Sequence, residues 1–129
     1  MPLMSEHAAR QLSGLQLAFM GDTVCDLLTR TMIIFEGRNI KDMHNEATGI
    51  VNARAQSQAL AVIRHLLTED ETDIVRRAHN AHIKHNVPKA ATREEYLNAT
   101  AFEALMGYLY LTGQMHRAQM LFRLSLIKE

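Results

Sequence analysis

Proline is the residue that most constrains the fold of this chain, because it is nearly absent. The 129 residues include only two prolines, Pro2 and Pro88. Proline breaks helices and is excluded from central strands, so long stretches of this chain can be helical without interruption. No segment shows the alternation of apolar and polar residues that is typical of a half-buried strand. The sequence therefore predicts an all-α fold, and its length predicts one domain over residues 1–129.

Residues that favour helix N-caps divide the chain into successive helices. Ser and Asn side chains accept hydrogen bonds from the free N–H groups of a first helical turn, and a Thr-x-x-Glu capping box satisfies two such groups. The expected N-caps are Ser5 for a short helix, Ser13 for one ending near Phe35 with Gly37 as its stop, Asn39 for one through Val51, and Asn52 for one through Leu66. Capping boxes at residues 68–71 and 92–95 open two more helices, Gly113 ends the second of these, and Met115 begins an amphipathic last helix.

Two acidic residues lie within runs that are otherwise mostly apolar or small. Asp22 lies in the run of residues 17–24, and Glu103 in the run of residues 98–108. Small neighbours on the same helical face would let two facing helices approach closely and bring the two carboxylates together. Adjacent carboxylates repel each other unless a cation or a proton joins them.

The residues alone leave two interpretations of this pair open. Each carboxylate can be a helix-surface group neutralised by one of the 14 Lys and Arg side chains, since structural ion pairs are common. Alternatively, the pair is a hard-cation site. Mg²⁺ and Mn²⁺ take oxygen ligands and commonly bind through one or two carboxylates together with a substrate phosphate.

Three stretches of the chain carry a resemblance to a known family. They are residues 12–22 (LSGLQLAFMGD), residues 43–48 and 51–56 (MHNEAT and VNARAQ), and residues 100–111 (TAFEALMGYLYL). In this order and spacing they resemble the ribonuclease III catalytic domain, and more closely its short branch, Mini-ribonuclease III. The resemblance implies a homodimeric helical bundle of the ribonuclease III endonuclease type, in which Phe19 matches the position that inserts into the partner subunit.

The same resemblance implies a metal-dependent endoribonuclease that cleaves double-stranded RNA. Asp22 and Glu103 would be its catalytic residues and its metal ligands, for Mg²⁺ or for Mn²⁺ as a substitute, and the products would carry a 5′-phosphate and a 3′-hydroxyl. Larger family members have further carboxylates where this chain has Ala18 and Thr100, so we expect one firmly held ion. As in the short branch, the chain leaves no room for a separate double-stranded-RNA-binding domain. The branch also implies maturation of precursor 23S ribosomal RNA, with a ribosomal protein or the precursor ribosome as a further partner.

Functions of two other classes stay open at this point. The reduced set of carboxylates would suit a non-catalytic helical dimer of the same fold that binds RNA or acts as a scaffold. A pair of carboxylates with several histidines would suit a metal-dependent phosphohydrolase of small nucleotides, but the chain has no paired His-Asp motif.

The segment of residues 76–93 contains basic residues and no Asp or Glu. Its candidate RNA-binding residues are Arg76, Arg77, His79, Asn80, Lys84 and Lys89. Uncompensated positive charge beside a helix break at Pro88 suits contact with phosphates, while a solvated face of unrelated basic residues is the alternative. The spacing of His79, His82 and His85 invites a zinc site, which the lack of cysteine partners disfavours.

Charge and cysteine content exclude several classes of protein. The formal net charge is zero, so any binding of nucleic acid must come from a local patch. The first residues carry Glu6 and Arg10 without an apolar core, and no later run is as long as a membrane span, so we expect a cytoplasmic protein without membrane contact. The single cysteine, Cys25, excludes an internal disulfide. Its apolar setting would raise its pKa, which makes it a poor nucleophile.

Overall fold

The structure is a computed structural model that describes residues 2–81, 87 and 90–127. Its elements are α1 (Glu6–Arg10), α2 (Gly14–Ile34), α3 (Ile40–Ile50), α4 (Ala53–Ile63), the 3-10 helix η1 (Arg64–Leu66), α5 (Glu69–His79), α6 (Arg93–Leu111) and α7 (Met115–Ser125). The described residues form no strand, which confirms the predicted all-α fold. None of the helices in this part of the chain is both long and apolar enough to cross a membrane.

The helices begin at the N-caps that the sequence predicts. The capping side chains, each of which accepts a hydrogen bond from an N–H of the first turn, are Ser5, Ser13, Asn39, Asn52, Thr68 and Thr92. Gly37 and Gly113 follow the ends of α2 and α6 with φ of 68° and 77°, a conformation that favours glycine. One boundary differs, because the helix predicted through Leu66 leaves α geometry after Ile63 and continues as η1.

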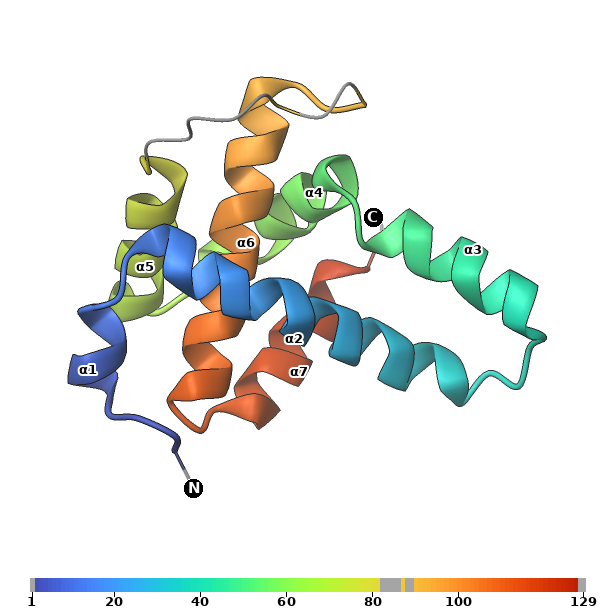
Figure 1. The fold of residues 1–129 in the computed structure, drawn as a ribbon, viewed down its shortest axis with the longest axis horizontal. Coiled ribbons are helices and arrows are strands. Elements are labelled where there is room, and N and C mark those ends of the chain that lie inside the picture. The colour runs from blue at the N-terminus through green and yellow to red at the C-terminus, as the bar shows by residue number, and fades with distance from the viewer. Residues whose placement is uncertain (1, 82–86, 88–89, 128–129) are drawn as a thin grey trace.

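Helix α6 lies at the centre of the fold and packs against α2, α4 and α5 (Figure 1). From Ala99 to Leu109, every residue of α6 except Glu103 is buried. A helix that is apolar on all sides is normally surrounded by protein. The one residue in this stretch that is not fully buried is therefore a carboxylate in the middle of the core helix.

Helices α2 and α6 cross near the middle of the molecule, with their backbones in direct contact (Figure 1). A Cβ atom at Gly21 would lie 1.6 Å from the backbone oxygen of Glu103, and one at Gly107 would lie 2.2 Å from the backbone oxygen of Leu17. No side chain fits at either position. The predicted close approach of two helices through small residues is thus confirmed.

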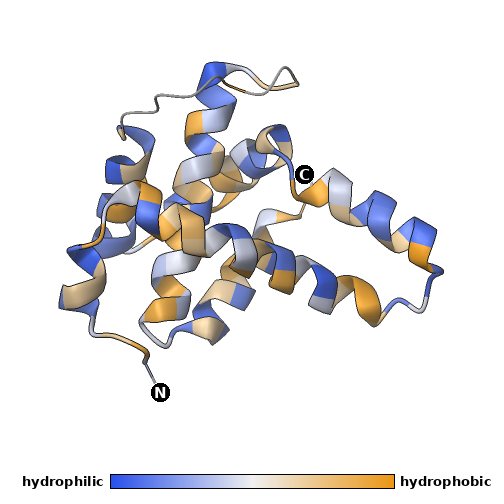
Figure 2. Cartoon of the chain, in the orientation of Figure 1, coloured by the Kyte–Doolittle hydropathy of each residue, from blue (hydrophilic) through white to orange (hydrophobic). Residues whose placement is uncertain are grey.

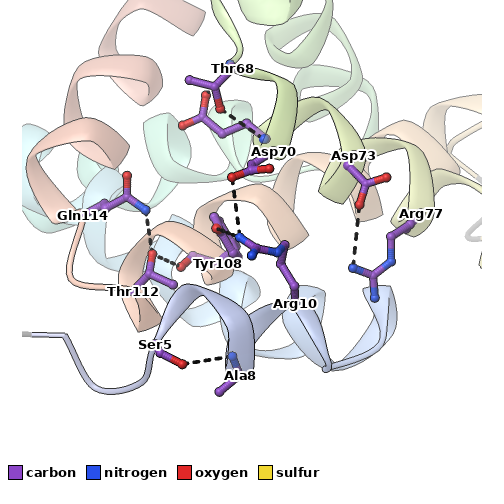
Figure 3. Close-up of polar contacts among 11 residues, drawn as sticks. Ser5, Ala8, Arg10, Thr68, Asp70, Asp73, Arg77, Tyr108, Thr112 and Gln114 are labelled. Atoms are coloured by element: carbon purple, nitrogen blue, oxygen red, sulfur yellow. Dashed lines mark hydrogen bonds and ion pairs between the residues drawn. The ribbon is translucent and has the colours of Figure 1, made fainter.

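Polar side-chain contacts join the remaining helices to α6 and to one another. Figure 3 shows Arg10 of α1 between Asp70 and Tyr108, with its Nη1 3.5 Å from an oxygen of each. Glu71 of α5 has a side chain that is 4% exposed and accepts hydrogen bonds of 2.9 and 2.8 Å from Nε and Nη2 of Arg117 in α7. Burial raises the pKa of Glu71, but hydrogen bonds from Arg117 and Thr68 outweigh it and hold the pKa below its usual value.

Helix α3 and the C-terminal part of α2 project from this body (Figure 1). Helix α3 has no buried residue, and Figure 2 shows that most of its residues are hydrophilic. It packs against α2 and α4, and ion pairs join Arg38 in the connecting loop to Glu36 and Glu46. The buried core of the fold therefore lies among the helices around α6.

Two glycine-to-alanine changes, one at the α2–α6 contact and one outside it, should have opposite effects on the free energy of unfolding. Gly107→Ala should lower the free energy of unfolding by at least ~2 kcal/mol, because the new methyl group meets backbone atoms. Gly49→Ala, in α3 with no atom within 4 Å of the added Cβ, should raise it by up to about 1 kcal/mol, since alanine favours a helix. Urea denaturation of both variants would measure the two effects. A Gly107→Ala protein as stable as the parent would contradict the contact.

Candidate active site

Asp22 and Glu103 meet at the α2–α6 crossing. Asp22 follows Gly21, the residue whose backbone touches that of Glu103. The two carboxyl groups lie close enough together for Asp22 to raise the pKa of Glu103. Asp22 lies on the exposed side of the pair, whereas Glu103 is partly buried. The structure therefore brings together the two carboxylates that the sequence predicts to converge.

The surroundings of Glu103 disfavour its negative charge. Burial, followed by the hydrogen bond and the charge of Asp22, raises the pKa of Glu103 to about 9. Asp26, one helical turn beyond Asp22, adds to this effect. At neutral pH, Glu103 in the metal-free protein therefore keeps its proton. A cation beside the two carboxylates would favour their ionisation at neutral pH.

The ion pairs of the described residues do not neutralise this site. None of them includes Asp22, Asp26 or Glu103. The interpretation of Asp22 and Glu103 as helix-surface groups paired with Lys or Arg is therefore not supported. The site keeps an excess of negative charge, which suits a cation.

The donor atoms of this site fit a hard divalent cation such as Mg²⁺ or Mn²⁺. Asp22 and Glu103 offer carboxylate oxygens, the ligand type that these ions prefer. Within the described ranges, no group of three or more His, Cys, Asp or Glu side chains is arranged to hold a metal ion. A cation here would therefore complete its coordination with water and with oxygens of a substrate, in agreement with the expected small ligand set.

Sequence analysis did not identify Asp26 or Gln56 as residues of this site. Asp26 carries a recognisable signal, because it follows Asp22 at the i+4 spacing of one helical face. Gln56 carries none. It lies in α4, and only the packing of α4 beside α6 brings its buried carboxamide to Glu103 and Cys25.

Cys25 lies behind the carboxylates and is fully buried. Burial, followed by the charges of Glu103 and Asp22, raises the pKa of the Cys25 thiol well above its usual value. The buried setting and the raised pKa agree with what the sequence predicts for Cys25, and a raised pKa weakens a thiol as a nucleophile.

The predicted RNA-binding segment has more acidic neighbours than its own sequence contains. Arg76 forms an ion pair with Asp73, and His79 Nε2 lies 2.8 Å from Glu94 Oε1. Arg77 also lies beside Asp73 (Figure 3), and its Nη2 donates a 2.9 Å hydrogen bond to the backbone oxygen of Leu12. These contacts supply the negative charge that residues 76–93 lack, so the free positive charge is smaller than the sequence alone indicates.

The rest of this segment is described only in part. Asn80 is the C-cap of α5 and is exposed. Lys84 and Lys89, together with Pro88, lie outside the described residues, and so do His82 and His85 of the zinc alternative.

Phe19 lies on the outer face of α2, where 84% of it is exposed. Leu15 and Leu27, at multiples of four residues from Phe19, are exposed on the same face. Phe19 is three residues from Asp22, so this apolar surface borders the carboxylate pair. A large exposed aromatic side chain of this kind suits an interface between proteins.

The raised pKa of Glu103 predicts how the stability of the metal-free protein depends on pH. Unfolded, this carboxyl ionises near its ordinary pKa, whereas the folded protein holds its proton up to a pKa of about 9. In EDTA, the free energy of unfolding should therefore fall as the pH rises from 5 toward 9, by up to about 1.4 kcal/mol per pH unit. Urea denaturation at several pH values would measure this slope.

Glu103→Gln should remove most of this slope, and adding Mg²⁺ to the parent at high pH should restore stability. Glu69→Gln changes an exposed carboxyl outside the site and should keep the parental slope. A parent protein whose stability in EDTA is flat over this range would show that Glu103 is ionised without a cation.

Comparison with known proteins places this chain in a family. The family model of the ribonuclease III domain matches residues 15–114. Mini-ribonuclease 3 from Thermoanaerobacter sp. (strain X514) is 41% identical over 125 residues, which cover 95% of this chain and 87% of that protein. Mini-ribonuclease 3 from Symbiobacterium thermophilum is 42% identical over 107 residues, 82% of each chain.

The fold agrees with this comparison. A crystal structure of a protein from Fusobacterium nucleatum superposes with a TM-score of 0.81 at 35% identity, covering 88% of this chain and 92% of that one. The matched stretches include both helices that carry the carboxylate pair. The chain therefore belongs to the ribonuclease III family, in its Mini-ribonuclease III branch.

Proposed function

We propose that this chain is a metal-dependent endoribonuclease that hydrolyses double-stranded RNA. Its membership of the ribonuclease III family makes it an endoribonuclease. The observation that carries the metal dependence is the carboxylate pair of Asp22 and Glu103, which is partly buried and has no cationic partner among the described ion pairs. Such a pair gives a reason for a cation to bind at this position.

Asp22 and Glu103 are the residues that would hold Mg²⁺, or Mn²⁺ in its place. Held by these two carboxylates, such a cation would supply an activated water for attack on a phosphodiester and would stabilise the charge on the leaving 3′ oxygen, and the products would carry a 5′-phosphate and a 3′-hydroxyl. Asp22 holds the exposed side of the pair, where a phosphate can approach. Glu103 holds the inner side, and its position is fixed by the backbone contact with Gly21.

The RNA would lie across the basic segment of residues 76–93, which begins in the last turn of α5. Arg76 has a side chain that is 63% exposed, so its partnership with Asp73 can be exchanged for a phosphate at little cost. His79, Asn80, Lys84 and Lys89 would extend this contact along the RNA backbone. Arg77 would contribute both to binding and to folding, because its hydrogen bond to Leu12 joins α5 to the start of α2.

A homodimer would place two such sites on the two strands of a duplex. Each chain has one pair of carboxylates, so cutting both strands requires two chains arranged symmetrically. The exposed face of Phe19 borders the site and would form the two-fold contact. The resemblance to the Mini-ribonuclease III branch supports precursor 23S ribosomal RNA as the substrate, with a ribosomal protein or the precursor ribosome as a further partner.

Cleavage of long duplex RNA by purified protein, with Mg²⁺ and with EDTA, tests this function. Asp22→Asn and Glu103→Gln should each lower the cleavage rate by more than about a hundredfold, since losing even a residue that supports a ligand costs 10–100-fold. Circular dichroism should show both variants folded, and Glu69→Gln serves as the control.

Full activity in either variant at unchanged Mg²⁺ would refute the assignment of these ligands. A parent protein that binds duplex RNA but never cuts it would instead support the non-catalytic scaffold.

Two phenylalanine substitutions, one on α2 and one directly after its last residue, test the dimer. Phe19→Ala should produce monomers at micromolar concentration and reduce cleavage, because it removes the aromatic side chain at the two-fold contact. Phe35→Ala is a matched control, since Phe35 is 85% exposed and follows the same helix, roughly 24 Å farther along it. Sedimentation velocity would measure both. A monomeric parent that still cuts both strands would contradict the dimer.

A further inference from the structure

Gln56 is a polar residue on a face of α4 that is otherwise apolar. The buried residues of α4 are Gln56, Ala59, Leu60 and Ile63, and Gln56 is 6% exposed. This face packs against α6. Next to it, Asn98 Nδ2 of α6 donates a 3.1 Å hydrogen bond to Ser57 Oγ. The packing of α4 against α6 and this neighbouring hydrogen bond therefore hold Gln56 in place beside α6.

The carboxamide of Gln56 faces Glu103 and Cys25. Gln56 Nε2 is buried and has no hydrogen-bond partner among the described residues. A buried amide nitrogen without a partner costs about 1–3 kcal/mol. If Gln56 served packing alone, a leucine or methionine would be more stable at this position.

The unused donor has a role once a cation binds. Both carboxylates must then be ionised, because metal ligands bind in their deprotonated form. The Glu103 carboxylate then needs a hydrogen-bond donor to hold it in orientation, because donors behind a metal ligand fix its geometry and tune its affinity. Asp26 cannot supply one as a carboxylate. Gln56 lies on the buried side of Glu103, and its Nε2 has no other hydrogen-bond partner among the described residues.

We propose that Gln56 is a positioning residue that holds the ionised Glu103 carboxylate in place for the metal ion. This inference rests on the proposed function, because it assumes that Asp22 and Glu103 bind a divalent cation. A neutral amide suits the role, since it supports Glu103 without adding another charge beside the carboxylates. The site would thus combine two carboxylate ligands, from α2 and α6, with one hydrogen-bond donor from α4.

Mn²⁺ binding to the purified protein without RNA tests this proposal directly. Free Mn²⁺ can be measured by electron paramagnetic resonance during a titration. Gln56→Met keeps the side-chain length but removes the donor, and should weaken Mn²⁺ binding about 10–100-fold. The Mg²⁺ concentration for half-maximal cleavage should rise by a similar factor, and part of the rate should return at high Mg²⁺. Gln58→Met makes the same change at an exposed position of α4 and should bind Mn²⁺ like the parent.

Thermal unfolding in EDTA separates positioning from packing. A positioning role predicts that Gln56→Met melts at the same temperature as the parent or higher, because the partnerless amide is gone. Gln56→Leu provides a second apolar variant. Parental Mn²⁺ affinity in either variant would overturn the proposal, and so would failure of both to fold, since the amide would then be structural.

The same titration distinguishes this inference from the proposed function. Asp22→Asn should lose Mn²⁺ binding altogether. If the parent binds Mn²⁺, Asp22→Asn does not, and Gln56→Met binds like the parent, the metal site stands and the role of Gln56 is wrong. If the parent itself binds no Mn²⁺, both are wrong.

Discussion

The contact between the backbones of α2 and α6 is the constraint on which the rest of the structure depends. Gly21 and Gly107 each lie against a carbonyl of the opposite helix, at distances that leave no room for a methyl group. This contact sets the depth of α6 in the core and the position of Glu103 beside Asp22. It also fixes where α4 and α5 can pack, because both lie against α6. Fold and candidate site therefore share one structural requirement.

Bringing two carboxylates together at this contact is unfavourable for the metal-free protein. The raised pKa of Glu103 lets it keep its proton at neutral pH, which removes one of the two repelling charges. The same pair, once ionised, offers the carboxylate oxygens that a divalent cation prefers. If the proposed cation binds here, its binding would require release of the Glu103 proton, and the stability of the fold and the proposed function would be linked through that proton.

Different helices contribute the residues that surround the carboxylate pair. Helix α2 contributes Asp22 and Asp26 together with the apolar surface around Phe19, while α6 contributes Glu103. Helix α4 contributes Gln56 from the interior. Farther away, Arg76 and His79 at the end of α5 are paired with Asp73 and Glu94. A phosphate would therefore have to compete with these acids, which makes RNA contact at this edge dependent on exchange of partners.

The sequence by itself determined where the helices begin and which two carboxylates come together. N-caps such as Ser13 and Thr92 act on N–H groups within three residues, so their effect can be read locally. The small residues around Asp22 and Glu103 likewise indicated two helices in close contact. Only the tertiary structure decided which other side chains reach that contact. Gln56 joins the site through the packing of α4, and Asp73 and Glu94 reach the basic segment from outside its boundaries. Contacts between helices depend on how their buried faces pack together, and no short stretch of sequence encodes that packing.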